Sequence, residues 1–110
     1  MKILKTTTDD KKTIYQMTKG ATIQRMQDAT GKDLVISDYV HYVDEKDDGS
    51  SVDILSILTE EGEIYATNSK TVTNSFFEIE EIAGNIKGET IEIVSGTTKA
   101  GRTYYDCCWK

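Results

Sequence analysis

The sequence contains no proline, a single histidine and only two cysteines in 110 residues. Without proline there can be no cis-proline turn, and a polyproline linker is not expected. The cysteines are adjacent, at Cys107 and Cys108. Neighbouring side chains on a strand point to opposite faces, so a disulfide between them is geometrically poor. Free thiols are typical of a reducing compartment, and we therefore expect a cytoplasmic protein.

Long apolar runs are also missing. No segment approaches the ~18 consecutive apolar residues of a membrane span, and the first ten residues lack the apolar centre of a secretory signal. We therefore expect no contact with a membrane. A chain of 110 residues suits one domain with one core, so residues 1–110 are predicted to form a single domain.

Catalytic and metal-binding patterns are absent as well. His41 stands alone within a β-like run, and with the two adjacent cysteines it does not supply the ligand spacing of a zinc site. Cys107 has no base and no orienting partner at a recognisable spacing. No glycine-rich phosphate-binding loop and no serine-hydrolase motif occurs. We predict that the protein is not an enzyme and uses neither a cofactor nor a metal.

The charged residues that are present are distributed unevenly. The net charge is −6. Residues 1–32 carry seven Lys or Arg against three Asp or Glu, residues 33–95 carry three against fifteen, and residues 96–110 carry three against one. The cations are therefore concentrated near the chain ends. A fold that brings the ends together would give a positive surface on an acidic body.

The apolar pattern predicts two helices. The first, near residues 10–19, is indicated by Asp10 as N-cap and by Gly20 after the last turn. The second begins after Asn68 or Ser69, ends at Ala83 and is closed by Gly84. Its apolar stripe consists of Val72, Phe76, Ile79 and Ala83, widened by Phe77 and Ile82.

Five strands are predicted around these helices. They cover residues 33–45, 52–59, 63–67 and the two arms of a hairpin at 91–109. The first is longer than a usual strand and is interrupted by Asp38, which indicates a bend or bulge there. In the third, Ile64 and Ala66 are expected to face the core and Tyr65 to face outward.

The order of these elements is that of an OB-fold, a small five-stranded barrel. We therefore predict a mainly β protein, a five-stranded OB-fold-like barrel with a helix between strands 3 and 4 and a short N-terminal helix. An SH3-like barrel and an α+β sandwich are the alternatives. Residues 1–8 fit a lead-in or a short edge strand, and residues 21–28 fit a strand or a short helical turn.

The final hairpin has a basic tip. The connector Gly96–Arg102 carries Lys99 and Arg102, and its glycines can take the positive φ that a tight connection needs. Asp106 is expected to face solvent because a carboxylate is costly to bury. Alternation along the strand then places Tyr104 and Cys108 outward with it, and Tyr105, Cys107 and Trp109 inward.

Tyrosines on strands and cations on loops together indicate binding of single-stranded nucleic acid. Such proteins stack bases on aromatic side chains and follow the phosphates with cations. OB barrels bind around strands 2–3 and the loops that join strands 1–2 and 4–5. The predicted stacking residues are Tyr65 and Tyr104, with Tyr39 or Tyr42 as a third. The predicted phosphate contacts are Lys99 and Arg102, joined by Lys19, Arg25 and Lys32.

Four segments resemble the small single-stranded-DNA-binding proteins of tailed bacteriophages that infect Gram-positive hosts. The segments are residues 13–20, 52–59, 62–69 and 97–104. The more specific parts are Tyr-Ala-Thr-Asn-Ser, which begins at Tyr65, and Lys-Ala-Gly-Arg, which begins at Lys99. The resemblance implies an OB-fold that coats single-stranded DNA during phage DNA replication or recombination, in the host cytoplasm. Replication or recombination proteins would then be further partners.

Two other functions fit the same residues. An acidic body can compete for a basic partner, which suits a protein-interaction module such as a replisome adaptor or an inhibitor of a host DNA-binding protein. A structural virion protein is the third interpretation. Free strand edges can also pair between copies, so a monomer and an oligomer both fit the sequence.

Overall fold

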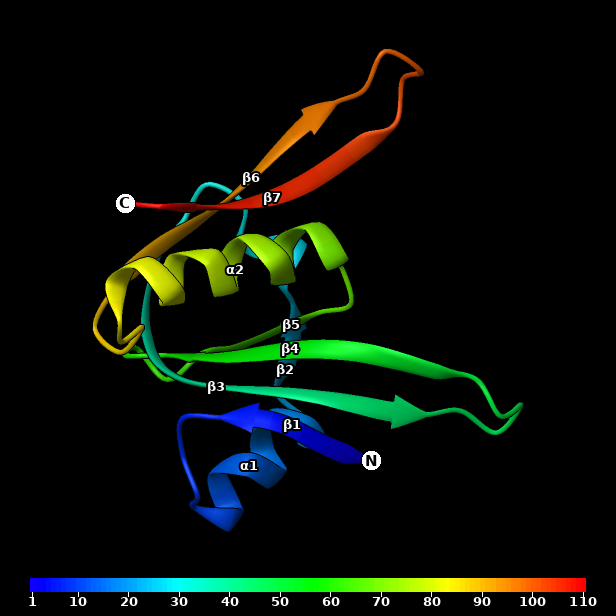
Figure 1. Ribbon diagram of the computed structural model, residues 1–110, viewed down its shortest axis with the longest axis vertical. Coiled ribbons are helices and arrows are strands. Elements are labelled where there is room, and N and C mark those ends of the chain that lie inside the picture. The colour runs from blue at the N-terminus through cyan, green and yellow to red at the C-terminus, as the bar shows by residue number, and fades with distance from the viewer.

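The computed structural model describes residues 1–110, which form a mainly β protein with two α-helices (Figure 1). In chain order the elements are β1 (Lys2–Thr6), α1 (Lys11–Thr18), β2 (Ile23–Arg25), the short 3₁₀-helix η1 (Met26–Ala29), β3 (Asp33–Glu45), β4 (Ser51–Thr59), β5 (Ile64–Thr67), α2 (Lys70–Ala83), β6 (Thr90–Thr97) and β7 (Thr103–Trp109). All strands belong to one strongly curled sheet, which forms half of a barrel.

β3 is the strand on which the sheet is built. β4 pairs with it from Ile36 to Glu45, while β6 pairs with residues 33–35 and β1 with residues 40–43. The register shifts between Ile36 and Asp38, so the bend predicted at Asp38 is confirmed. A bulge increases the local twist of a strand, which allows one long strand to serve two halves of a curled sheet.

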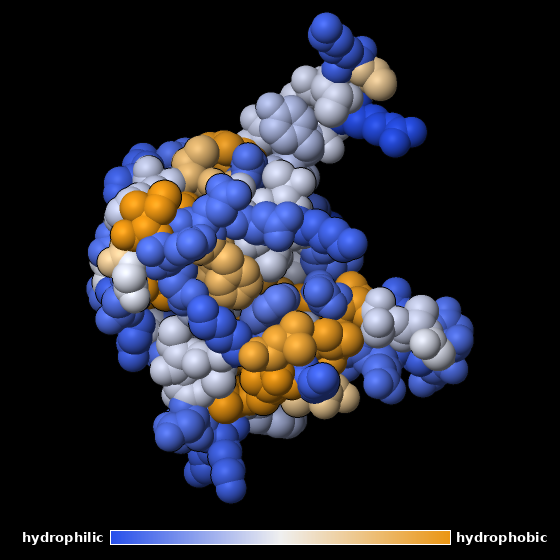
Figure 2. All heavy atoms as spheres, viewed as in Figure 1, coloured by the Kyte–Doolittle hydropathy of each residue, from blue (hydrophilic) through white to orange (hydrophobic).

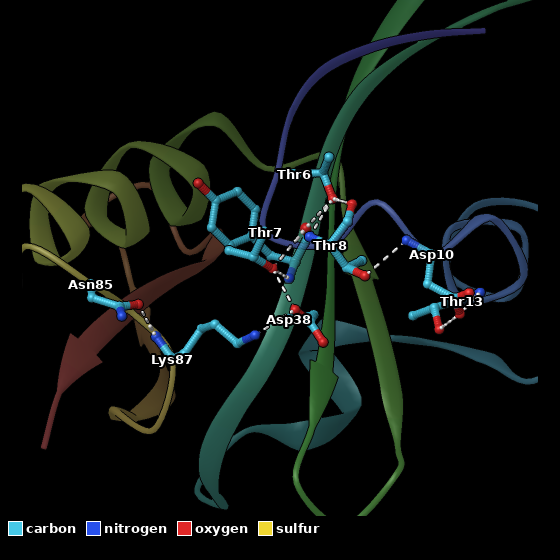
Figure 3. A network of polar contacts seen from close by, with 9 residues as sticks. Thr6, Thr7, Thr8, Asp10, Thr13, Asp38, Asn85 and Lys87 are labelled. Carbon is cyan, nitrogen blue, oxygen red and sulfur yellow. Dashed lines mark hydrogen bonds and ion pairs between the residues drawn. The ribbon is translucent and has the colours of Figure 1, made fainter.

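The bend is held by polar contacts with the segment after β1 (Figure 3). The hydroxyl of Thr7 donates to Asp38 Oδ1 at 2.9 Å and accepts a hydrogen bond from the backbone N–H of Tyr39 at 2.9 Å. Lys87 Nζ lies 3.3 Å from the same carboxylate oxygen. These contacts fix the end of β1 against the middle of β3.

Four strands form a Greek key. β3, β4 and β5 follow one another as antiparallel neighbours, and the chain then returns through α2 so that β6 lies beside β3. This arrangement places the fourth strand next to the first, as a Greek key requires. The long return connection explains why the large helix stands between β5 and β6.

The sheet has seven strands, so the prediction of five is wrong. β1 forms from the segment that fitted either a lead-in or an edge strand, and residues 21–28 form both β2 and η1. The helix predicted between strands 3 and 4 therefore follows the fifth strand. All but the last residue of β1 are exposed, and β2 has only three residues, so neither carries an alternating apolar pattern that would reveal it.

Both helices begin and end close to the predicted positions. The Asp10 side chain accepts a hydrogen bond from Thr13 N–H, and the contacts with Thr13 lower the pKa of this carboxyl. The hydroxyl of Ser69 accepts from Val72 N–H at the start of α2, and Gly84 ends that helix with a φ of 80°. Polar N-caps and a glycine in a positive-φ conformation are the local signals that set these boundaries.

The main core lies between α2 and the inner face of the curled sheet. Val72, Phe76 and Ile79 of α2 are buried in it, as predicted. Phe76 is fully buried and meets Tyr39 edge to face, with ring centroids 5.3 Å apart. Ile82 is 75% exposed, so its predicted place on the buried stripe is wrong.

A second, smaller cluster lies on the other side of the sheet under α1. It contains Met17 of α1 together with Val40, Tyr42 and Ile64 from the strands. The central strands are therefore covered on both faces. Alternation of side chains along a strand predicts one buried face and one face exposed to solvent. It therefore could not indicate that α1 covers the second face.

Candidate nucleic-acid interface

Two hairpins project to the same side of the molecule (Figure 1). One is formed by β3 and β4 and the other by β6 and β7, and the first turn of α2 lies between them. Figure 2 shows the space between the two arms as a hollowed side of the molecule. We call this surface, bounded by the β3–β4 loop (residues 46–50), residues 68–70 and the β6–β7 loop (residues 98–102), the concave face.

The β6–β7 hairpin carries the basic tip. Its strands pair from Ile91 to Thr97, and the tip is closed by hydrogen bonds between Thr98 and the backbone of Arg102 and Gly101. Gly101 has a φ of 82°, a conformation that favours glycine. Lys99 and Arg102 are exposed and no carboxylate lies within ion-pair distance of either. The predicted hairpin is therefore confirmed as a projecting arm with two free cations.

Tyr104 lies across the hairpin from Gly96. A Cβ atom added at Gly96 would come 2.4 Å from the Tyr104 hydroxyl and 2.5 Å from the ring carbon that bears it. Gly96 does not have a positive φ, so its predicted role in the turn is wrong. It instead leaves room for the hydroxyl end of the Tyr104 ring, which lies against the Gly96 backbone, while 48% of the residue remains exposed.

Replacing Gly96 with alanine should move the Tyr104 ring without unfolding the protein. The backbone at Gly96 is acceptable for alanine, and the atoms that must yield belong to an exposed side chain. We expect the ring resonances of Tyr104 to shift in an NMR spectrum while the melting temperature changes by only a few degrees. Unchanged Tyr104 resonances would contradict the contact between ring and glycine.

The other facing predictions for β7 are only partly correct. Cys107 is buried and Cys108 is exposed, as expected, and burial raises the pKa of the Cys107 thiol to about 12. Asp106 is half-buried and accepts a hydrogen bond from the Ser75 hydroxyl of α2 at 2.5 Å. Trp109 is 43% exposed, so its predicted inward position is wrong. Its indole N–H donates to Glu89 Oε1 at 3.1 Å instead.

Three of the four predicted stacking tyrosines are unavailable for stacking. The exposed fractions of Tyr39, Tyr42 and Tyr65 are 1%, 3% and 1%. Burial, with Glu63 adding to the effect, raises the pKa of Tyr65 to about 12, and burial also raises the pKa values of Tyr39 and Tyr42. A ring enclosed in this way cannot offer a face to a base. The prediction that Tyr65 faces outward is wrong.

The reason is that both faces of β5 are covered. Ile64 lies in the cluster under α1, and Tyr65 lies in the main core under α2. The Tyr65 hydroxyl reaches the edge of the core and donates to Glu63 Oε2 at 2.8 Å. A tyrosine with its hydroxyl at the rim can be buried at little cost, since its polar atom keeps a partner.

The predicted cations are divided among different environments. Lys19 pairs with Asp44 at 3.0 Å on the side of the sheet covered by α1, and Arg25 pairs with Asp28 at 3.2 Å. Lys32 is exposed and unpaired just before β3, near β6. The structure therefore brings together Lys99, Arg102 and Tyr104 on one arm and does not gather all five predicted cations around them.

Two cations of the concave face were not predicted from the sequence. Lys46 stands in the β3–β4 loop and Lys70 is the first residue of α2, and neither has an ion-pair partner. Lys46 stands between Glu45 and Asp47-Asp48, so the loop at residues 45–51 is acidic as a whole and was expected to contribute little to binding. A cation is unfavourable at a helix N-terminus. The position of Lys70 at the start of α2 could therefore have indicated a role other than helix stability.

The placement of metal-ligating side chains and the apolar character of the helices are two further features of the structure. No group of three or more His, Cys, Asp or Glu side chains is placed to hold a metal ion. None of the helices has the length and apolar character needed to cross a bilayer. No protein-family model, no curated protein and no solved structure matches this chain.

Proposed function

We propose that the protein binds single-stranded DNA without catalysis and largely without sequence preference, along its concave face. The observation that carries this proposal is the projecting β6–β7 arm, on which two unpaired cations stand beside an exposed tyrosine. Cations that follow phosphates and an aromatic ring that stacks on a base are the two components of sequence-tolerant binding to single strands.

Cations at the other two boundaries of the concave face, the β3–β4 loop and the start of α2, support the same function. Lys46 in the β3–β4 loop and Lys70 at the start of α2 are unpaired, as are Lys99 and Arg102 on the other arm. Elsewhere on the surface, Lys5, Lys87 and Lys110 are paired with carboxylates, whereas Lys2, Lys11, Lys12 and Lys32 are not. A strand lying there would meet these unpaired cations together with three carboxylates, Asp47 and Asp48 of the β3–β4 loop and Asp53 beside Lys70.

The architecture is compatible with an OB-type barrel. β3 to β7 contain a Greek key in a curled sheet with one long helical connection, and the β3–β4 and β6–β7 loops correspond to the two loops that OB barrels use. β1 and β2 would be additions to that barrel. By its resemblance to phage proteins, the chain would act in the host cytoplasm during replication or recombination.

The proposal is tested with a fluorescent oligo-dT in an anisotropy titration at about 0.05 M and about 0.2 M salt. With three tyrosines buried, we expect charge to supply most of the affinity, which should therefore fall steeply as salt is added. Binding to a mixed-sequence oligonucleotide should be similar. The absence of binding at the lower salt concentration would refute this function.

Tyr104→Ala should weaken oligo-dT binding by about 1 kcal/mol, near the lower end of the range for a stacked base. The modest size follows because the hydroxyl end of the ring lies against Gly96 and only 48% of the residue is exposed. Tyr15→Ala is the matched control, since Tyr15 is 63% exposed on α1, away from the concave face. Equal affinities of the two variants would exclude stacking on Tyr104.

A groove on another part of the surface favours the second candidate, a protein-interaction module. It has a volume of about 810 Å³ and lies between β1 and the end of α2, with Glu80 and Glu81 on its wall. Figure 2 shows apolar side chains gathered nearby, where β1 and the outer halves of β3 and β4 run. Ile3 and Leu4 are 39% and 45% exposed there. A protein that fails to bind oligo-dT but binds replication proteins would fit this alternative.

A further inference from the structure

A hollow of about 320 Å³ is formed between β2–η1 on one side and β4–β5 with the β3–β4 loop on the other. It is lined by Arg25, Met26, Gln27, Lys46, Val52, Ile54, Ala66, Thr67 and Asn68. Lys46 and Asn68 also belong to the boundary of the concave face. Ile54 packs on the cluster under α1, so the hollow lies on the side of the sheet opposite α2 and meets the concave face at its edge, through Lys46 and Asn68.

The lining lacks carboxylates, which is unusual in a chain with 19 of them. Each of the three other surface hollows includes at least one acidic side chain: Glu80 and Glu81 in the largest, Asp53 in one beside α2, and four in one beside the start of β3. A nucleic-acid segment would be repelled by such groups. Among the hollows of this surface, only this one presents cations and neutral groups alone.

The chemistry of the lining is suited to a nucleotide. Val52, Ile54 and Ala66 supply an apolar surface for a flat ring, and Gln27 and Asn68 supply amide groups. Neither amide side chain makes a hydrogen bond within the chain. An amide offers donors and an acceptor, so these groups can meet the edges of different bases.

Two cations stand at the same hollow. Lys46 has no carboxylate partner, and Arg25 is paired only with Asp28 at 3.2 Å. The Arg25 and Asp28 side chains are 73% and 52% exposed, and an exposed pair of this kind is worth little, about 0–1 kcal/mol. Both cations are therefore available to phosphates on either side of a bound base.

The size of the hollow restricts the ligand. It lies at the lower end of the ~300–1,000 Å³ that small-molecule pockets occupy, so it suits one flat ring system better than a large ligand. We propose that this hollow receives one base of the single-stranded DNA on the concave face, with Arg25 and Lys46 contacting the neighbouring phosphates. This inference rests on the proposed function.

The test compares an oligo-dT with an oligonucleotide of the same length in which the bases are replaced by abasic sites. A base held by the protein contributes roughly tenfold in affinity. In the variant Gln27→Ala/Asn68→Ala we expect the preference for oligo-dT over the abasic strand to fall by about tenfold, while the salt dependence is unchanged. Gln16→Ala removes an exposed amide on α1 and should leave the preference unchanged.

Photocrosslinking gives an independent readout that does not depend on mutation. An oligonucleotide containing 4-thiothymidine should attach to peptides that contain residues 25–27 or 66–68 of the wild-type protein. Adducts confined to the β6–β7 arm, or an unaltered base preference in the folded double variant, would overturn the inference and leave the proposed function standing. If wild-type protein fails to bind oligo-dT at low salt, the proposed function falls and this inference falls with it.

Discussion

Phe76→Ala should lower the free energy of unfolding by about 3–5 kcal/mol, the usual cost of emptying the site of a buried phenylalanine. Phe76 is fully buried in the main core, and its ring centroid lies 5.3 Å from that of Tyr39 and 5.5 Å from that of Phe77. The expected loss is a large part of the ~5–15 kcal/mol that stabilises a domain. Urea denaturation followed by circular dichroism would measure it.

Ile82→Ala is the matched control on the same helix. Ile82 is 75% exposed, so its truncation should change the unfolding free energy by no more than about 0.5 kcal/mol. The pair of variants tests which face of α2 meets the sheet. A Phe76→Ala protein as stable as the wild type would mean that α2 does not cover the half-barrel through this side chain.

The elements that the sequence predicted well are those with strong local signals. Asp10 and Ser69 are polar caps whose side chains accept from the first turn of a helix, and Gly84 ends α2. The long strand at residues 33–45 and its bend at Asp38 also follow from local chemistry, since a carboxylate interrupts an otherwise apolar run. Such signals act over a few residues and do not depend on the rest of the fold.

The elements that the sequence could not predict depend on long-range contacts. β2 pairs in parallel with β5, about forty positions away in the chain, through only three residues. α1 covers a sheet face that strand alternation alone assigns to solvent. That cover buries Tyr42, and the larger helix buries Tyr39 and Tyr65. Tyrosine fits both a core and a binding surface, so its identity could not separate the two.

The candidate site shows the same division. The basic tip could be predicted because Lys99 and Arg102 lie within one short connector between two strands. Lys46, Asn68 and Lys70 come from different elements, and only the fold brings two hairpins and a helix start to the same side. In addition, Lys19 and Arg25 gained carboxylate partners that the sequence did not reveal.

The double variant Lys99→Ala/Arg102→Ala should reduce affinity for oligo-dT and flatten its dependence on salt. Each phosphate contact with a single strand contributes a slope of roughly −0.7 to log K against log salt. Losing two contacts should therefore flatten the slope by about 1.4 units. Between 1 M and 0.1 M salt, the affinity of the variant should then rise about 25-fold less than that of the wild type. Phosphate contacts carry no base information, so oligo-dT and mixed sequences should be affected equally.

Lys11→Ala/Lys12→Ala removes the same charge from exposed positions on α1 and serves as the control for long-range electrostatics. If the tip contacts phosphates directly, the control should retain nearly the wild-type slope, because charges separated by more than the ~10 Å screening length at 0.1 M salt interact weakly. Neither variant should melt much earlier than the wild type, since Lys99 and Arg102 side chains make no ion pair within the chain. Equal slopes for both variants would show that net charge governs binding and that the β6–β7 tip makes no phosphate contact of its own. A loss of affinity without a change in slope would instead assign the tip a role in shape or ordering.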